Sequence, residues 1–164
     1  MGQPSGDDYR RLELAIEESL RCAPSDRAYS VGAVIVDERG AEIARGRSRE
    51  TGPRVHAEEA ALAKLRSGDL RLPGATIYSS LEPCSRRSSG PFSCTELIIA
   101  AGIGRVVFAW REPDLFVAGA DGAERLAAAD VIVVELAELA SRARAVNAHL
   151  RLPDEADRPT SRRP

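Results

Sequence analysis

Short apolar runs alternate with helix-forming stretches along most of this sequence, and this alternation limits the fold more than any other feature. The runs are rich in β-branched or aromatic residues and are bounded by turn residues, which is typical of β-strands. The expected strands cover residues 31–37, 42–47, 76–80, 105–110 and 131–135, the first two forming a hairpin. Helices are expected at about residues 8–22, 55–67, 94–101, 120–129 and 136–149. The sequence therefore predicts an α/β fold, a three-layer α/β/α sandwich with a mixed five-stranded sheet.

The length of 164 residues suits one domain with a single core. Residues 1–7 and 153–164 lack apolar periodicity, so we expect them to be mobile tails around a folded unit of residues 8–152. The longest apolar run, near residues 97–103, is too short to span a membrane, and no charged-then-apolar leader opens the sequence. We therefore expect a cytoplasmic protein that does not bind membranes.

Charge and cysteine content limit the expected partners. The chain has 23 basic and 25 acidic residues, and aromatic residues make up 4% of it. Nucleic-acid-binding surfaces are usually basic, and those that bind single strands add stacked rings, so we expect no nucleic-acid partner. Three cysteines without an export signal do not form a disulfide framework, so metal binding or burial is their expected use.

His56, Cys84 and Cys94 are the candidate metal ligands. His56 begins the helix-forming string HAEEAALAKL, and both cysteines are expected at or near the first turns of helices, where free amides favour a thiolate. One imidazole and two thiolates leave the fourth tetrahedral position of Zn²⁺ open for water, which is the arrangement of a catalytic zinc site. A closed structural site would need a fourth protein ligand, for which Cys22 or His149 could serve.

Glu58 is the candidate catalytic residue. It lies two residues after His56, and side chains at that spacing converge only near the N-terminal end of a helix. Zinc lowers the pKa of water towards neutrality, and an adjacent carboxylate can take the proton and deliver it to a leaving amine. We therefore predict Zn²⁺ as the cofactor and a proton-shuttle role for Glu58.

These residues resemble the signature of the cytidine and deoxycytidylate deaminases, H-x-E followed by P-C-x-x-C. The chain has HAE at residues 56–58 and PC at residues 83–84, but nine residues separate Cys84 from Cys94 instead of two. This longer loop is similar to that of the riboflavin-biosynthesis pyrimidine deaminases, and CSRRSSG at residues 84–90 resembles the C-S-x-R-x-S-G pattern of their fungal branch. The resemblance covers about residues 30–114 and implies a cytidine-deaminase-like fold.

The resemblance also implies a substrate, a diamino-ribosylamino- or ribitylamino-pyrimidinone phosphate that is deaminated hydrolytically. Arginine binds phosphate through paired hydrogen bonds, and arginines at 45, 47, 49, 54, 86 and 87 are expected to border the site. Ordinary surface charge is the alternative explanation in a chain with so many arginines. The predicted substrate contacts are Arg49, Arg54, Ser80, Arg86, Arg87 and Phe116.

Departures from the family pattern leave other functions open. Residues 28–32 read AYSVG where many bacterial members have Asn-Pro-x-Val-Gly, so an expected pocket asparagine is absent. A deaminase of a cytosine nucleoside, a cytosine nucleotide or a specialised metabolite is the second interpretation, and a catalytically silent zinc-binding regulatory subunit is the third. Bacterial members are commonly fused to a reductase, for which this sequence is too short, so we expect a stand-alone deaminase with any reductase on a separate chain. The resemblance further implies a homodimer or homotetramer.

Overall fold

A mixed five-stranded sheet forms the centre of the computed structural model, which describes residues 2–87, 90–111 and 121–150. The strands are β1 (Gly32–Val36), β2 (Glu42–Arg47), β3 (Thr76–Leu81), β4 (Arg105–Trp110) and β5 (Ile132–Glu135). Their order across the sheet is β2-β1-β3-β4-β5. β1 is antiparallel to both of its neighbours, whereas β3, β4 and β5 are parallel to one another. β1 and β4 are almost wholly buried because helices cover both faces of the sheet.

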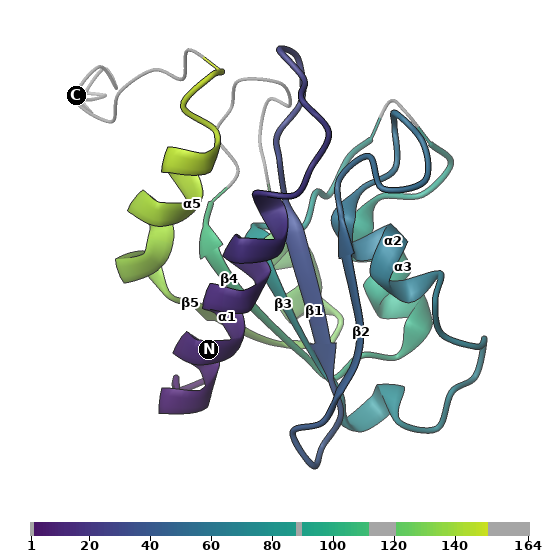
Figure 1. The fold of residues 1–164 in the computed structure, drawn as a ribbon. Coiled ribbons are helices and arrows are strands. Elements are labelled where there is room, and N and C mark those ends of the chain that lie inside the picture. The colour runs from purple at the N-terminus through teal and green to yellow at the C-terminus, as the bar shows by residue number, and fades with distance from the viewer. Residues whose placement is uncertain (1, 88–89, 112–120, 151–164) are drawn as a thin grey trace, which may run out of the picture.

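Helices form a layer on each face of the sheet (Figure 1). The helices on one face are α1 (Gly6–Ser19) and α5 (Ala140–Val146), and those on the other are α2 (Ala57–Leu62), α3 (Cys94–Ala101) and α4 (Gly122–Ala128). Short 3-10 turns, Leu72–Gly74 and Ala137–Leu139, precede β3 and α5. Within the described ranges no helix has both the length and the apolar character that a membrane span requires. The predicted α/β/α sandwich with a mixed five-stranded sheet is therefore confirmed.

Two glycines allow helices to pack directly on strands. A Cβ atom at Gly46 of β2 would collide with the backbone of α2 at Ala61, and one at Gly32 of β1 would collide with the backbone of α1 at Ala15. Any side chain at these positions would force the helix away from the sheet. The absence of a side chain at Gly46 matters for the site, because α2 begins immediately after His56.

The N-terminus of α1 is anchored by a buried carboxylate. The helix begins at Gly6, inside the segment expected to be a tail, because Ser5 and Asp8 form a reciprocal capping box. Asp8 also accepts hydrogen bonds from Tyr78 Oη (2.8 Å) and Arg105 Nη1 (2.7 Å). Burial alone would raise the pKa of Asp8, but the bonds from Arg105, Ser5 and Tyr78 hold it well below its usual value.

Other local differences follow from turns that the sequence pattern did not predict. α2 ends at Leu62 rather than near residue 67, because the amides of Lys64 and Leu65 bond three residues back in successive tight turns. Pro83 begins no helical turn and lies in a loop after β3. The expected C-terminal tail, residues 153–164, lies outside the described residues.

Candidate functional site

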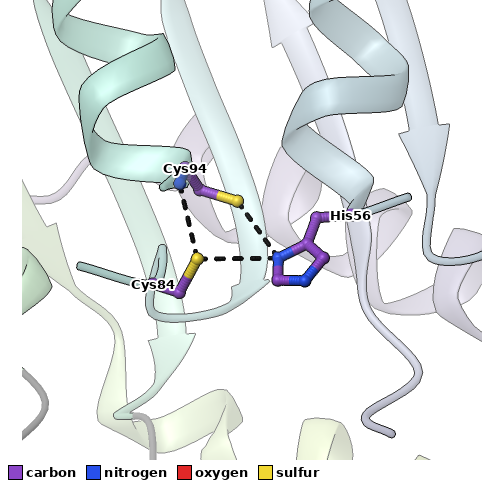
Figure 2. Close-up of side chains that lie close together, drawn as sticks. All are labelled: His56, Cys84 and Cys94. Carbon is purple, nitrogen blue, oxygen red and sulfur yellow. Dashed lines mark hydrogen bonds between the residues drawn. The ribbon is translucent and has the colours of Figure 1, made fainter. Parts of the chain in front are cut away.

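The three predicted metal ligands meet in space although they are far apart in the sequence (Figure 2). His56 is the N-cap residue of α2, Cys84 follows β3, and Cys94 is the first residue of α3. The Nδ1 atom of His56 lies 3.5 Å from Cys84 Sγ and 3.3 Å from Cys94 Sγ, and the three donor atoms lie within 4.8 Å of one another. One nitrogen and two sulfur donors that converge in this way fit Zn²⁺ with an open fourth position.

The start of α3 holds the two cysteines together. The amide of Cys94 donates to Cys84 Sγ at 3.4 Å, and the amide of Thr95 donates to the carbonyl oxygen of Cys84 at 3.1 Å. Cys94 begins a helix, as predicted. The expectation of a helical turn at Cys84 is wrong, since this residue lies in the loop after β3 and its sulfur is stabilised by the first amide of α3 instead.

The cluster contains no fourth protein ligand among the described residues. Cys22 donates its thiol hydrogen to the carbonyl oxygen of Val31 (3.4 Å). Cys22 and His149 line a separate cavity between the end of α1 and the end of α5. Neither residue therefore closes the zinc site, which argues against a purely structural role for the metal.

The thiols and the imidazole influence one another electrostatically. The hydrogen bond from Cys94 and, next, the interactions with His56 together lower the pKa of Cys84 to about 4 against the effect of burial. The same pairing, together with burial, raises the pKa of Cys94 well above its usual value. Burial opposes protonation of His56, but the Cys84 thiolate raises its pKa overall. A divalent cation would replace the protons that these groups share, because metal ligands bind in their deprotonated forms.

Glu58 lies beside the ligands and is almost fully buried, with 3% of its surface exposed. The hydroxyl of Ser79 on β3 donates to Glu58 Oε1 at 2.7 Å. Burial raises the pKa of Glu58; the Ser79 bond lowers it in part, and the nearby Cys84 thiolate raises it. A raised pKa makes it easier for this carboxyl group to accept a proton and later release it, as general acid–base catalysis requires.

A cavity of about 390 Å³ has His56, Glu58 and Cys84 of this group in its wall. The lining residues belong to three segments of the chain, within residues 27–31, 48–58 and 81–87. A volume of this size is in the range of small-molecule sites. The geometry therefore combines a metal-binding cluster, a buried carboxyl group and space for a heterocycle.

Comparison with known proteins identifies the family. The family model described as the cytidine and deoxycytidylate deaminase zinc-binding region matches residues 6–110. The chain belongs to this deaminase family. The matched region contains all three metal donors and Glu58, so the predicted zinc cofactor agrees with both the family and the donor set.

Individual deaminases show which branch the chain resembles. A diaminohydroxyphosphoribosylamino-pyrimidine deaminase of Schizosaccharomyces pombe is 42% identical over 123 residues, covering 74% of this chain and 30% of that protein. The riboflavin biosynthesis protein RibD of Escherichia coli is 37% identical over 116 residues, covering 69% of this chain and 29% of that protein. The chain thus spans about a third of the length of these curated relatives. The predicted resemblance to the riboflavin-biosynthesis deaminases is confirmed.

Solved structures of deaminases confirm the predicted cytidine-deaminase-like fold. Acinetobacter baumannii RibD, form 1, has a TM-score of 0.73 and 29% identity, covering 87% of this chain and 38% of that chain. The Aspergillus oryzae Rib2 deaminase in complex with DARIPP has a TM-score of 0.67 and 22% identity, covering 88% of this chain and 98% of that chain. The similarity to the Rib2 deaminase concerns the fold alone.

The arginines predicted to border the deaminase site take different positions. Arg45 and Arg47 do not line the cavity; they pair with the buried carboxylate of Glu18, so the expectation that they border the site is wrong. Arg54 and Arg86 do line the cavity, and both are exposed. Both side chains are therefore accessible to solvent.

Arg49 and Arg87 also line the cavity, but their guanidinium groups donate to the protein itself. Arg49 donates to two main-chain oxygens and one hydroxyl. Arg87 Nη2 donates to the carbonyl oxygen of Arg54 at 2.6 Å and pairs with Glu59 Oε2 at 2.8 Å. The same Glu59 oxygen accepts from the amide of His56 at 3.2 Å. Arg87 therefore connects the loop between the two cysteines to the segment that carries His56.

The remaining predicted contacts lie elsewhere or outside the described residues. The hydroxyl of Ser80 accepts from the amide of Gly32 at 3.1 Å and does not line the cavity. Its neighbour Ser79 is the hydroxyl that contacts Glu58, and the two-residue period of a strand requires that only one of the pair points to this side. Phe116 falls outside the described residues.

Proposed function

We propose that the chain catalyses the zinc-dependent hydrolytic deamination of an aminopyrimidine. The observation that carries this proposal is the buried carboxyl group of Glu58 beside the converging donors of His56, Cys84 and Cys94. A structural zinc site does not require a non-ligating carboxyl group in the cavity wall, whereas a deaminase requires one for proton transfer.

The residues of the site have separate roles in the proposed reaction. His56, Cys84 and Cys94 would hold Zn²⁺, and when bound the metal supplies Lewis-acid activation of the water that replaces the amine. Glu58 would carry the two protons of that water in turn, one to the ring nitrogen beside the reacting carbon and one to the leaving amine, so that this carbon gains a carbonyl oxygen and ammonia departs. Ser79 holds the Glu58 carboxyl group in one orientation through its 2.7 Å hydrogen bond.

The substrate we propose is a diamino-ribosylamino- or ribitylamino-pyrimidinone phosphate of riboflavin biosynthesis. The S. pombe relative is named as a deaminase of such a compound, and the A. oryzae Rib2 deaminase has been solved with DARIPP. Arg54 and Arg86, with Arg27 beside them in the cavity lining, offer exposed guanidinium groups to a phosphate. Alanine substitutions at Arg54 and Arg86 should raise KM for the phosphorylated compound more than for its dephosphorylated form.

A cytosine nucleotide is the second candidate substrate. Ala28 lies in the cavity lining, in the segment where many bacterial riboflavin-pathway members carry a pocket asparagine. A smaller, apolar side chain at this point changes which ring substituents the cavity accepts. Specialised aminopyrimidines fall under the same alternative.

Ammonia release tests the proposed function directly. The zinc-loaded protein is assayed with the ribosylamino- and ribitylamino-pyrimidinone phosphates, deoxycytidylate, cytidine and cytosine, with Glu58→Gln as the control. Turnover of a pyrimidinone phosphate that is lost in the control supports the proposal, and turnover of a cytosine compound supports the alternative. Zinc binding without turnover of any compound would refute both and favour a regulatory subunit.

We also propose a cytoplasmic homodimer or homotetramer whose product is the substrate of a reductase. A solved Thermotoga maritima protein is named as both a deaminase and a reductase, and its alignment covers 85% of this chain and 39% of that one. Light scattering on the purified protein would test the oligomeric state. Hydride-transfer assays with the deaminated product would show whether this chain itself lacks the reductase step.

A further inference from the structure

Residues 28–31 are a non-regular segment that immediately precedes β1, and Ala28, Tyr29 and Val31 of this segment form one wall of the cavity. Ser30, between them, lines the separate cavity beside Cys22 and His149. One backbone bond, from the amide of Ser48 to the carbonyl oxygen of Val31 (2.9 Å), holds its end, and side chains supply further contacts to its main chain. The hydroxyl of Ser48 accepts from the amide of Val31 at 3.1 Å, and Arg49 Nη1 donates to the carbonyl oxygen of Tyr29 at 2.8 Å. Buried main-chain groups need such partners, so the path of the wall depends on the residues that supply them.

Asn147 supplies the partners of both main-chain polar groups of Ser30, whose hydroxyl accepts from Arg49 Nη2 at 2.8 Å. The amide of Ser30 donates to Asn147 Oδ1 at 2.7 Å, and Asn147 Nδ2 donates to the carbonyl oxygen of Ser30 at 3.1 Å. Nδ2 also donates to the carbonyl oxygen of Ala143, one turn earlier on α5 (3.1 Å). The orientation of the side-chain amide is fixed by chemistry, because the amide of Ser30 can only donate.

Position and burial make this contact a distinct feature of the chain. Asn147 is the C-cap residue of α5, and 2% of its surface is exposed. It lies outside residues 6–110, the part that the family model matches, and on the helix layer opposite α2 (Figure 1). A residue of the C-terminal helix thus reaches the backbone of the cavity wall from the other face of the sheet.

Helix α5 also contacts the wall indirectly, through the ring of Trp110 on β4. Tyr29 packs edge-on against Trp110, with ring centroids 5.7 Å apart and an interplanar angle of 84°. The guanidinium carbon of Arg144 on α5 lies 5.5 Å from the centroid of Trp110. Contacts on both sides therefore hold Tyr29 and Ser30 in one conformation, which lowers the entropy lost when a ligand binds against them.

We propose that Asn147 is a positioning residue for substrate binding: it sets the shape of the 28–31 wall without touching the metal or the reacting atoms. The inference rests on the proposed deaminase function for the identity of the ligand. Loss of the Asn147 amide would free both main-chain polar groups of Ser30 and loosen the wall, while the metal donors and Glu58, on other segments, keep their places. Asn147 is therefore expected to affect substrate binding and not the chemical step.

The test compares Asn147→Leu, which replaces the amide with an apolar group of similar size, with Arg142→Ala as the matched control. Arg142 lies on the same helix and pairs at the surface with Glu13, so this variant removes an α5 contact without affecting Ser30. With the diamino-ribosylamino-pyrimidinone phosphate, Asn147→Leu should raise KM about tenfold, the scale of one or two lost hydrogen bonds, with kcat within about twofold of wild type. Zinc content should stay at the wild-type value, and the Ser30 amide should exchange with deuterium faster.

An unchanged KM, or equal losses of kcat and bound zinc, would overturn the proposal, since those results describe a residue that only stabilises the fold. If Asn147→Leu does not fold, Asn147→Ala is judged by the same criteria, because its smaller side chain leaves room for water at Ser30. Ligand binding is also followed by the fluorescence of Trp110, the one tryptophan of the chain. A wild-type protein that binds the pyrimidinone phosphate without deaminating it would refute the proposed function. In that case the Kd of each variant for this compound would still decide the role of Asn147.

Discussion

Replacing Arg87 with alanine should weaken zinc binding although Arg87 is not a ligand. Its side chain is 5% exposed, and the substitution removes both the 2.6 Å hydrogen bond to the Arg54 carbonyl and the 2.8 Å ion pair with Glu59. Glu59 is 35% exposed, so solvent screens the pair, and we assign about 1 kcal/mol to each interaction. The sum of about 2 kcal/mol corresponds to about thirtyfold in zinc affinity, within the range known for residues that orient metal ligands.

Competition with a chromogenic chelator measures this affinity without any substrate. The matched control is Arg86→Ala, because Arg86 is the adjacent arginine of the same loop and is exposed. We expect the control to retain wild-type zinc affinity and Arg87→Ala to lose zinc at lower chelator concentration. Equal affinities in the two variants would refute the argument that Arg87 ties the cysteine loop to the His56 segment.

Three further substitutions test the catalytic, electrostatic and packing arguments. Glu58→Gln should lower kcat by about a thousandfold with zinc retained, because the proton shuttle is lost; ammonia release and zinc content measure this. Asp8→Asn should destabilise the fold at neutral pH. The wild-type advantage should shrink as the pH falls below 3.8, the ordinary value, because the pKa of Asp8 is lowered in the folded state; urea unfolding at several pH values measures this. Gly46→Val should cost more than about 3 kcal/mol, since its side chain would collide with the backbone of α2; the melting temperature measures this.

Each of these expectations has a contrary outcome. Wild-type turnover by Glu58→Gln would remove the shuttle from the mechanism. A stability difference between wild type and Asp8→Asn that stays constant with pH would show that the Asp8 hydrogen bonds do not act through its charge. A Gly46→Val protein with an unchanged melting temperature would mean that α2 can shift away from β2.

The sequence predicted the bounds of helices and strands where the apolar pattern and a local backbone signal indicate the same boundary. The bounds predicted for β4 (Arg105–Trp110) and α3 (Cys94–Ala101) match the structure, because Gly102 adopts a positive φ of 76° and ends α3 between two strongly apolar runs. The end of α2 was less predictable. Its composition favours a longer helix, but the chain turns after Leu62, where Lys64 Nζ donates to the carbonyl oxygen of Arg45 on β2 and to Glu50. Tertiary contacts of this kind leave no local pattern.

Some residues of the site were likewise predictable from the sequence and others were not. The metal donors and Glu58 were predictable because their residue types and spacing are specific to the chemistry. The arginines were not, because position in the sequence does not distinguish exposed Arg86 from Arg87, whose side chain is buried. Asn147 gave no signal, since its partner Ser30 is 117 residues away.

The cavity wall at residues 28–31 is held through its backbone, and this has a consequence for how the protein can change. Arg49, Ser48 and Asn147 bind main-chain atoms, so their contacts are indifferent to the side chains at Arg27 and Ala28. Substitutions at those two positions can alter the groups presented to a ligand while the path of the chain stays the same. New substrate preferences are thus accessible to evolution, or to an engineer, without loss of the scaffold.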